Sequence, residues 1–202
     1  MECYIISDDN YYLLGVEYIA DRIDAVRRVI CIDIKTGISH FNPASGDVVV
    51  LAVTSHRLRR KFMHRTELTW CRLIILVKSP FSKRPFQCNL PCVLAWNTSD
   101  DRLIQYLQKM AGTDFRWHTI PSARDTDVLC ALSTGCNVST LSKRTGLSTK
   151  LIYRMRSSVF ARFGILGCNI ATSLMICRDI LDMMQNNKNN TKVLADREIL
   201  DF

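Results

Sequence analysis

The stretch NVSTLSKRTGLSTKLIYRMRSSVFARF, residues 137–163, contains two helix signals separated by a glycine. Asn137 and Ser148 are residue types that cap helix N-termini, and Gly146 is typical of the position that ends a helix. We therefore expect a short helix ending at Gly146 and a second one running from Ser148 to Gly164. A short helix, a tight turn and a capped second helix indicate a helix-turn-helix, in which the second helix enters the DNA major groove.

The second of these helices separates apolar from polar side chains. The apolar stripe recurs at steps of three, four and four residues and consists of Ile152, Met155, Val159 and Phe163. We expect it to pack on neighbouring helices. The opposite side carries hydrogen-bond donors suited to phosphates and base edges, namely Lys150, Tyr153, Arg154 and Ser157.

Charge supports the same interpretation. The chain has 202 residues, 27 Lys+Arg and 19 Asp+Glu, for a formal charge of +8. Between Val128 and Arg178 there is no Asp or Glu, although the segment contains Lys143, Arg144, Lys150, Arg154, Arg156, Arg162 and Arg178. Because surfaces usually mix both signs, this asymmetry indicates a polyanionic partner. The alternative is a solvated basic face.

Two further helices flank this pair. Ser122 and Asp125 form a capping-box pattern that opens a helix through Ser133. Asn169 precedes a fourth helix with apolar residues at steps of four, three, four and three, namely Ile170, Leu174, Cys177, Leu181 and Met184. We expect a linker over 113–120, a four-helix domain over 121–184 and a tail over 185–202.

Residues 1–112 have the different rhythm of an α/β domain. Short apolar runs alternate with amphipathic segments, which is typical of βα units on a parallel sheet. The five expected strands are at 4–6, 29–32, 48–53, 73–77 and 92–95, and amphipathic helices follow the first and the last. The fold class is α/β plus all-α, with a flavodoxin-like order suiting the five strands.

Several classes of protein are disfavoured. The longest apolar run, from Val48 to Val53, is far shorter than the roughly 20 residues of a membrane-spanning helix. The acidic N-terminus MECYIISDDN does not resemble a signal peptide, so we expect a cytoplasmic protein. Cys88 and Cys92 lack further ligands nearby for a tetrahedral metal site. We expect no metal and no cofactor.

The segment 123–165 resembles the DNA-binding domain of LuxR-type regulators, including NarL- and FixJ-like response regulators. The shared positions are an acidic residue after Arg124, Val128-Leu129, Gly135, Leu141-Ser142, Leu147-Ser148, Ile152, Arg156-Ser157, Val159 and Gly164-Ile165. The resemblance implies binding of double-stranded DNA through Val138 to Ser157. It places Thr149, Lys150, Tyr153, Arg154 and Ser157 near the groove, with Lys143, Arg144 and Arg162 as candidates for phosphates. It also implies a dimer contact on 169–184, while the alternative is that this helix packs on the second and third helices.

The sequence departs from the family in the second helix. The family usually has Thr-Val-Lys and a histidine where this chain has Leu151-Ile152-Tyr153 and Met155. We expect the fold to survive these changes and the preferred DNA sequence to differ, because Tyr153 replaces a flexible cation.

The first domain resembles a response-regulator receiver that has lost its chemistry. Asp8 and Asp9 resemble the acidic pair that holds Mg²⁺ in receivers, but Ala52 occupies the phosphoacceptor position and Trp96 the place of the phosphate-binding lysine. In this respect the first domain resembles the degenerate receivers of enterobacterial capsule and fimbrial regulators. We expect Asp8 and Asp9 to cap the next helix or stay exposed, and we expect no phosphorylation and no catalysis.

The run HRLRRKFMHR, residues 56–65, holds five cations from Arg57 to Arg65. A solvated helix face is the first interpretation, and phosphate contacts or docking of an acidic partner are the alternatives.

These features favour a transcription regulator that binds DNA as a homodimer or as a heterodimer with another LuxR-type regulator. The first alternative is an auxiliary or antagonist subunit that acts by pairing with such a regulator. The second is a receiver phosphorylated on another acidic residue.

Overall fold

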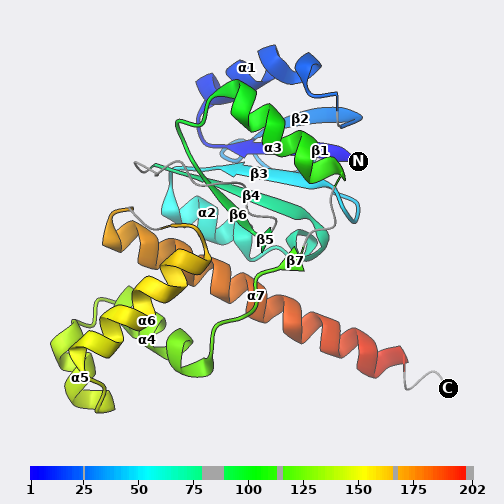
Figure 1. Ribbon diagram of the computed structural model, residues 1–202. Helices are drawn as coiled ribbons and strands as arrows, with labels where there is room; N and C mark the ends of the chain where they lie inside the picture. Colours follow the sequence, from blue (N-terminus) through cyan, green and yellow to red (C-terminus); the bar gives the residue numbers. More distant parts are fainter. Residues whose placement is uncertain (25, 79–88, 113–115, 166–167, 199–202) are drawn as a thin grey trace.

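A five-stranded parallel sheet forms the centre of the first half of the chain in the computed structural model (Figure 1). The structure describes residues 1–24, 26–78, 89–112, 116–165 and 168–198. The strands lie in the order β2-β1-β3-β4-β6, the flavodoxin-like order expected from the sequence. Their bounds are β1 (Glu2–Ser7), β2 (Arg28–Asp33), β3 (Val48–Ala52), β4 (Arg72–Val77) and β6 (Cys92–Ala95). A separate two-stranded ladder joins β5 (Asn89–Leu90) to β7 (Arg116–Trp117).

The sheet is buried on both faces, which explains why its strands are continuous apolar runs. Helices α1 (Asn10–Ile19) and α3 (Asp100–Gly112) cover one face and pack on side chains such as Ile5, Val50 and Ile74. A short 3-10 turn, η1 (Ala20–Arg22), follows α1. Helix α2 (His56–Met63) and the 3-10 turn η2 (Thr66–Trp70) lie on the other face.

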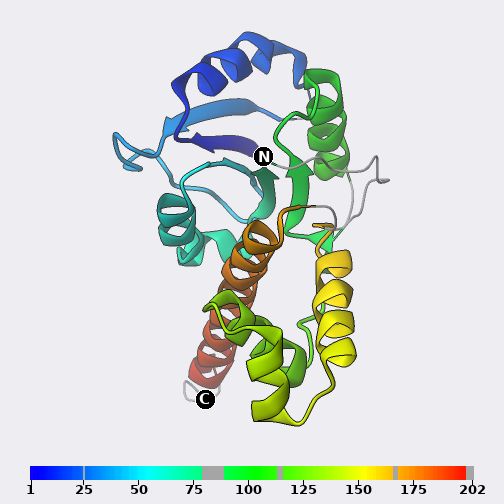
Figure 2. The same cartoon turned by 90° about the vertical axis from the view of Figure 1, so that its left-hand side faces the viewer.

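The second half consists of four helices, α4 (Ala123–Ser133), α5 (Val138–Thr145), α6 (Thr149–Arg162) and α7 (Ile170–Glu198). Figure 2 shows the first three of them gathered at the end of the molecule remote from α1. A small core of their own holds them together and consists of Val128, Leu132, Leu141, Leu147 and Ile152. The first three expected helices are therefore present at the expected positions.

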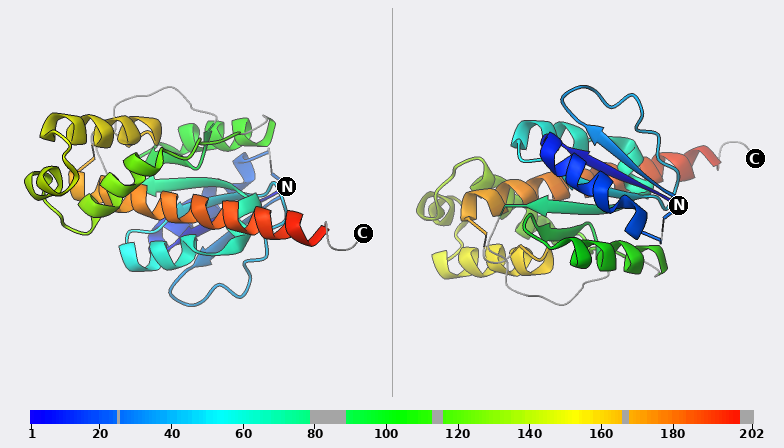
Figure 3. Two further views of the ribbon diagram at one scale, coloured as in Figure 1. Left: turned by 90° about the horizontal axis from the view of Figure 1, so that it is seen from below. Right: turned by 90° about the horizontal axis from the view of Figure 1, so that it is seen from above.

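Helix α7 differs from the prediction in length and in location. The sequence predicted a tail from residue 185, but the helix continues to Glu198 and has 29 residues. It runs along the underside of the sheet (Figure 3). Its buried side chains, among them Ile176, Ile180 and Leu181, belong to the same hydrophobic cluster as Leu51 and Ile75 of the sheet. The last helix of the chain thus completes the core of the first domain.

No helix in the described part of the chain combines the length and the apolar character needed to cross a membrane. The expectation that Cys88 and Cys92 form no metal site cannot be compared with the structure, because Cys88 lies outside the described residues.

Candidate nucleic-acid interface

The α5–α6 unit is fixed by local hydrogen bonds at each end of its turn. Asn137 accepts a hydrogen bond from the backbone N–H of Thr140 at 2.7 Å, and Ser148 accepts one from that of Leu151 at 3.2 Å. Gly146 adopts φ of 70°, the left-handed conformation that favours glycine at a helix C-terminus. The Ser142 hydroxyl then donates to the carbonyl of Leu147 across the turn at 2.6 Å. The orientation of α6 relative to α5 is therefore defined by the sequence of the turn itself.

The inner side of α6 is apolar, as the spacing predicted, with two differences. Ile152, Val159 and Phe163 are buried. Met155 is only half-buried, and Phe160, which the spacing did not single out, is buried instead. Phe160 is buried because the C-terminal half of α6 joins the cluster that holds α7 and the sheet, whereas Met155 lies partly buried against the smaller cluster of α4 and α5.

The outer side of α6 presents the predicted polar residues to solvent. All eight predicted contact residues are exposed, namely Lys143, Arg144, Thr149, Lys150, Tyr153, Arg154, Ser157 and Arg162. Four of them lie on one sector of α6, and Lys143 and Arg144 lie in the last turn of α5. Arg162 lies at the other end of α6 and donates to the carbonyl of Thr119 at 3.3 Å. The described side chains of α5 and α6 include no acid, so the surface is cationic throughout.

Arg156 is a contributor that the spacing analysis did not assign to the site. Its guanidinium lies 5.0 Å from the ring centre of Tyr153 and 5.9 Å from that of Phe160. A guanidinium stacked in this way stabilises the ring's orientation through a cation–π interaction. Tyr153 is 48% exposed, so its side chain is accessible at the surface while the Arg156 guanidinium lies against its ring. The sequence feature that could have predicted this contact is the three-residue spacing between Tyr153 and Arg156, which places both side chains on the same side of the helix.

The face of α7 expected to form a dimer contact is buried within the chain. Ile176, Cys177, Ile180 and Leu181 are all at most 1% exposed, and they pack with side chains of the sheet as well as those of α4 and α6. The packing alternative therefore holds for these four residues, while a dimer contact elsewhere on 169–184, where Ile170 and Met175 are exposed, stays a prediction. The alternative expectation was that this helix packs on the second and third helices. It did not include the sheet, because a local sequence pattern does not indicate contacts between residues so far apart in the chain.

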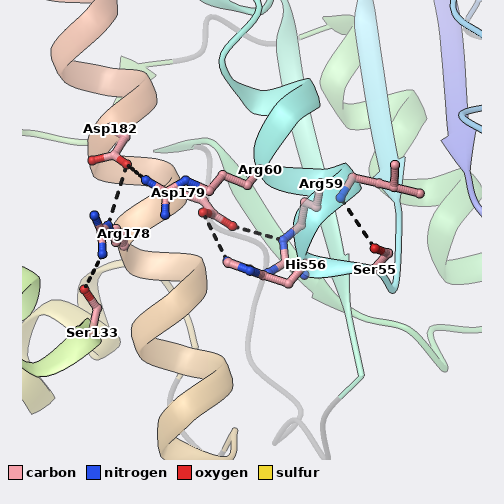
Figure 4. Close-up of polar contacts among 9 residues, drawn as sticks. Ser55, His56, Arg59, Arg60, Ser133, Arg178, Asp179 and Asp182 are labelled. Atoms are coloured by element: carbon pink, nitrogen blue, oxygen red, sulfur yellow. Dashed lines mark hydrogen bonds and ion pairs between the residues drawn. The ribbon is translucent and has the colours of Figure 1, made fainter. Parts of the chain in front are cut away.

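The basic run on α2 binds acids of α7 rather than solvent (Figure 4). Asp179 is fully buried; its Oδ2 lies 3.3 Å from Arg59 Nε and its Oδ1 lies 3.5 Å from His56 Nε2. One turn on, Asp182 pairs with Arg60 at 3.0 Å and lies 3.9 Å from Arg178. The solvated-face interpretation is wrong for Arg59 and Arg60, and the acidic partner considered as an alternative lies in the same chain.

Burial dominates the electrostatics of Asp179. Desolvation raises the pKa of this carboxyl above its ordinary value, although Arg59 and His56 favour its charged form. The remaining cations of the run have different surroundings. Arg57 and Lys61 are exposed, and Arg65 pairs with Glu67 while lying 5.2 Å from the ring centre of Phe41.

The residues expected at a degenerate phosphorylation site, Ala52, Asp8, Asp9 and Trp96, each have a partner within the chain. Ala52 ends β3 and is fully buried, and its carbonyl accepts a hydrogen bond from the Ser7 hydroxyl at 2.7 Å. Asp9 caps α1 by accepting from the N–H groups of Tyr11 and Tyr12, as expected. Trp96 packs on Tyr12 at a centroid distance of 5.2 Å, and the Lys78 ammonium lies 5.5 Å from the Trp96 ring.

Asp8 neither caps the helix nor remains exposed, which corrects the prediction. Its carboxylate accepts hydrogen bonds from the Thr54 N–H, the Thr54 hydroxyl and the Ser55 N–H, at 2.9, 2.9 and 2.8 Å. Burial alone would raise the pKa of Asp8, but these hydrogen bonds lower it below the ordinary value. Among the described residues no three His, Cys, Asp or Glu side chains gather as metal ligands.

No protein-family model and no curated protein matches the sequence. Among solved structures, the chain is similar to RcsB from Salmonella enterica serovar Typhimurium bound to promoter rprA in the presence of phosphomimetic BeF3-. The identity is 16%, 88% of this chain and 98% of that chain are covered, and the TM-score is 0.46. It is also similar to full-length FixJ from B. japonicum, with 15% identity, 90% and 97% coverage and a TM-score of 0.32.

Proposed function

We propose that this protein is a transcription regulator that binds duplex DNA through α5 and α6. The observation that carries the proposal is the exposed acid-free face of α6, on a helix whose turn, caps and apolar side fix its direction. Lys150, Tyr153 and Arg154 contact base edges in the major groove, with Thr149 and Ser157 beside them. Lys143, Arg144 and Arg162 contact phosphates and set the register on the duplex.

Regulation does not use phosphorylation in this proposal. Ala52 has no nucleophilic atom, and the Asp8 carboxylate is already occupied by three donors from Thr54 and Ser55. Phosphoryl transfer requires an acceptor, a metal to neutralise the phosphate and a cation for the developing charge. Treatment with acetyl phosphate and Mg²⁺ therefore leaves the mass of the protein unchanged, whereas a stable added phosphate would favour the receiver alternative.

The test of DNA binding is selection from a pool of randomised duplexes by the purified full chain, followed by titration across a salt series. We expect a selected motif whose affinity falls steeply with salt, because cations that neutralise phosphates release counterions. Replacing Lys150 and Arg154 with Ala abolishes selection. The matched control replaces Arg57 and Lys61 with Ala, which removes the same charge from the exposed side of α2.

A second candidate function is that of an auxiliary subunit that pairs with another LuxR-type regulator. The observation that favours it is an exposed apolar stripe on α1, remote from α6. Unselective binding, equal for the α6 variant and the α2 control, would favour this candidate.

A further inference from the structure

Helix α6 holds one guanidinium against two aromatic rings. The central carbon of the Arg156 guanidinium lies 5.0 Å from the ring centre of Tyr153 and 5.9 Å from that of Phe160. The three side chains share one side of the helix because they are three and four residues apart. Phe160 belongs to the core that α6 shares with α7 and the sheet, whereas Tyr153 lies at the surface. Arg156 therefore connects the exposed ring to a buried one.

Arg156 is partly withdrawn from water. The residue is half-buried, and its Nε is inaccessible to solvent and has no hydrogen-bond partner among the described residues. A cation–π interaction becomes stronger when the cation is shielded from water. The two ring contacts therefore restrain the guanidinium, and the guanidinium in turn restrains the ring of Tyr153.

Tyr153 differs in chemistry from the rest of the exposed face. It is the only large apolar side chain exposed on α5 and α6, two helices that the structure describes completely. Its exposed neighbours Lys150, Arg154 and Ser157 are polar. The major groove displays one apolar group, the C5-methyl of thymine, among donors and acceptors. The ring and this methyl group are therefore complementary.

We propose that the Tyr153 ring contacts the C5-methyl group of a thymine, and that Arg156 is the positioning residue that holds the ring for this contact. The inference rests on the proposed DNA-binding function and specifies which feature of a base one residue of that site recognises. A ring that is already restrained loses less conformational freedom when it binds. The Tyr153 hydroxyl can both donate and accept a hydrogen bond, so by itself it distinguishes base edges poorly. The apolar contact supplies the distinction between thymine and the other bases.

The test uses the purified full chain and the motif that it selects from randomised duplexes. Each thymine of the motif is replaced in turn with deoxyuridine, which lacks the methyl group and keeps the hydrogen-bonding groups. We expect one position at which this replacement weakens wild-type binding by about fourfold, the effect of losing one buried methyl-sized group. Tyr153→Phe keeps the methyl effect because the ring remains, and Tyr153→Ser abolishes it.

Arg156→Met tests the positioning role, because it removes the cation and keeps an unbranched side chain. We expect the methyl effect to fall below about twofold while the salt dependence of binding is unchanged. Adding Tyr153→Ser should reduce it no further, since the two residues act together. The matched control is Lys143→Met, which removes a cation expected to contact phosphate. It should weaken binding to the thymine and deoxyuridine duplexes equally and lower the salt slope by about 1.

The outcomes separate this inference from the proposed function. A motif in which no thymine is sensitive to deoxyuridine overturns the thymine contact, as does a methyl effect that survives Tyr153→Ser or disappears in Tyr153→Phe. If Arg156→Met behaves like Lys143→Met, with circular dichroism confirming the fold of both, Arg156 contacts phosphate and the positioning role is wrong. In all these cases the motif remains and still depends on Lys150 and Arg154. Absence of any selected motif overturns DNA recognition itself and this inference with it.

Discussion

Asp8 shows how a side chain typical of one chemistry can serve another purpose. Its carboxylate joins the end of β1 to the loop that follows β3, because Thr54 and Ser55 donate to it. A carboxylate with several such donors favours its charged form, so its pKa is lowered. Asp8 therefore acts as a structural acceptor in this protein.

The lowered pKa of Asp8 has a consequence for acid stability. A group with a depressed folded-state pKa stabilises the protein above its unfolded value, near 3.8, and this contribution is lost as the pH falls through the folded pKa. We expect Asp8→Asn to cost about 1–3 kcal/mol at neutral pH, because an amide cannot accept from all three donors. In urea denaturation the difference from wild type should shrink below about pH 4, and a constant difference would contradict this account.

The second prediction at the residue scale concerns the stability contributed by the buried ion pair of Asp179 and Arg59. Removing its charge by Asp179→Asn leaves Arg59, which is 6% exposed, without a counterion. Breaking a buried pair in this way costs about 3–5 kcal/mol, which denaturant titration would measure. Replacing both partners, with Arg59→Met and Asp179→Leu, should cost much less because no charge remains buried. If the single and double variants were equally destabilised, the pair itself would be irrelevant.

At the scale of single elements, the α5–α6 turn depends on the backbone of Gly146. At φ of 70° an alanine is strained, and the cost is roughly 1–2 kcal/mol. Gly146→Ala should therefore destabilise the protein and weaken DNA binding by displacing α6. The control is Gly15→Ala, which lies inside a helix with open space around it and should stabilise α1 by up to about 1 kcal/mol. Thermal unfolding of both variants would show shifts of opposite sign.

The elements that the sequence predicted are those fixed by local interactions. The caps at Asn137 and Ser148 bond to residues three positions away, and the strands are apolar runs that any buried parallel sheet requires. Contacts between distant residues escaped prediction. Asp8 meets partners 46 and 47 residues away, and Arg59 meets Asp179 at a separation of 120. Periodicity reports which face of a helix is buried but not which element buries it.

For the candidate interface, the sequence predicted which side chains are exposed but not which of them contact one another. Exposure of Lys150, Tyr153 and Arg154 followed from a helical wheel. The contact of Arg156 with the rings of Tyr153 and Phe160 did not, because it depends on side-chain rotamers, which a helical wheel does not give. The continuation of α7 was missed for a related reason, since the Asn-rich stretch after Met184 has weak helix propensity.

At the scale of the whole molecule, the two halves share one hydrophobic cluster through α7. We expect a single unfolding transition, in which tryptophan fluorescence and far-UV circular dichroism coincide. Truncation after residue 165 should unfold the sheet as well, because it uncovers Leu51 and Ile75 and leaves Arg59 unpaired. A truncated chain with an intact, soluble α/β half would show that α7 is dispensable for it.

The position of α7 after all the strands of the sheet also matters during synthesis. The strands are synthesised before α7. Ile176 lies roughly 100 residues after Val77 in the sequence, so translation takes about 5–20 s to proceed from one to the other. Throughout that interval the growing polypeptide has one apolar side of its sheet incompletely covered. Ribosome-associated chaperones would find this nascent chain a substrate, and its half-life in the cell would depend on how promptly the last helix arrives.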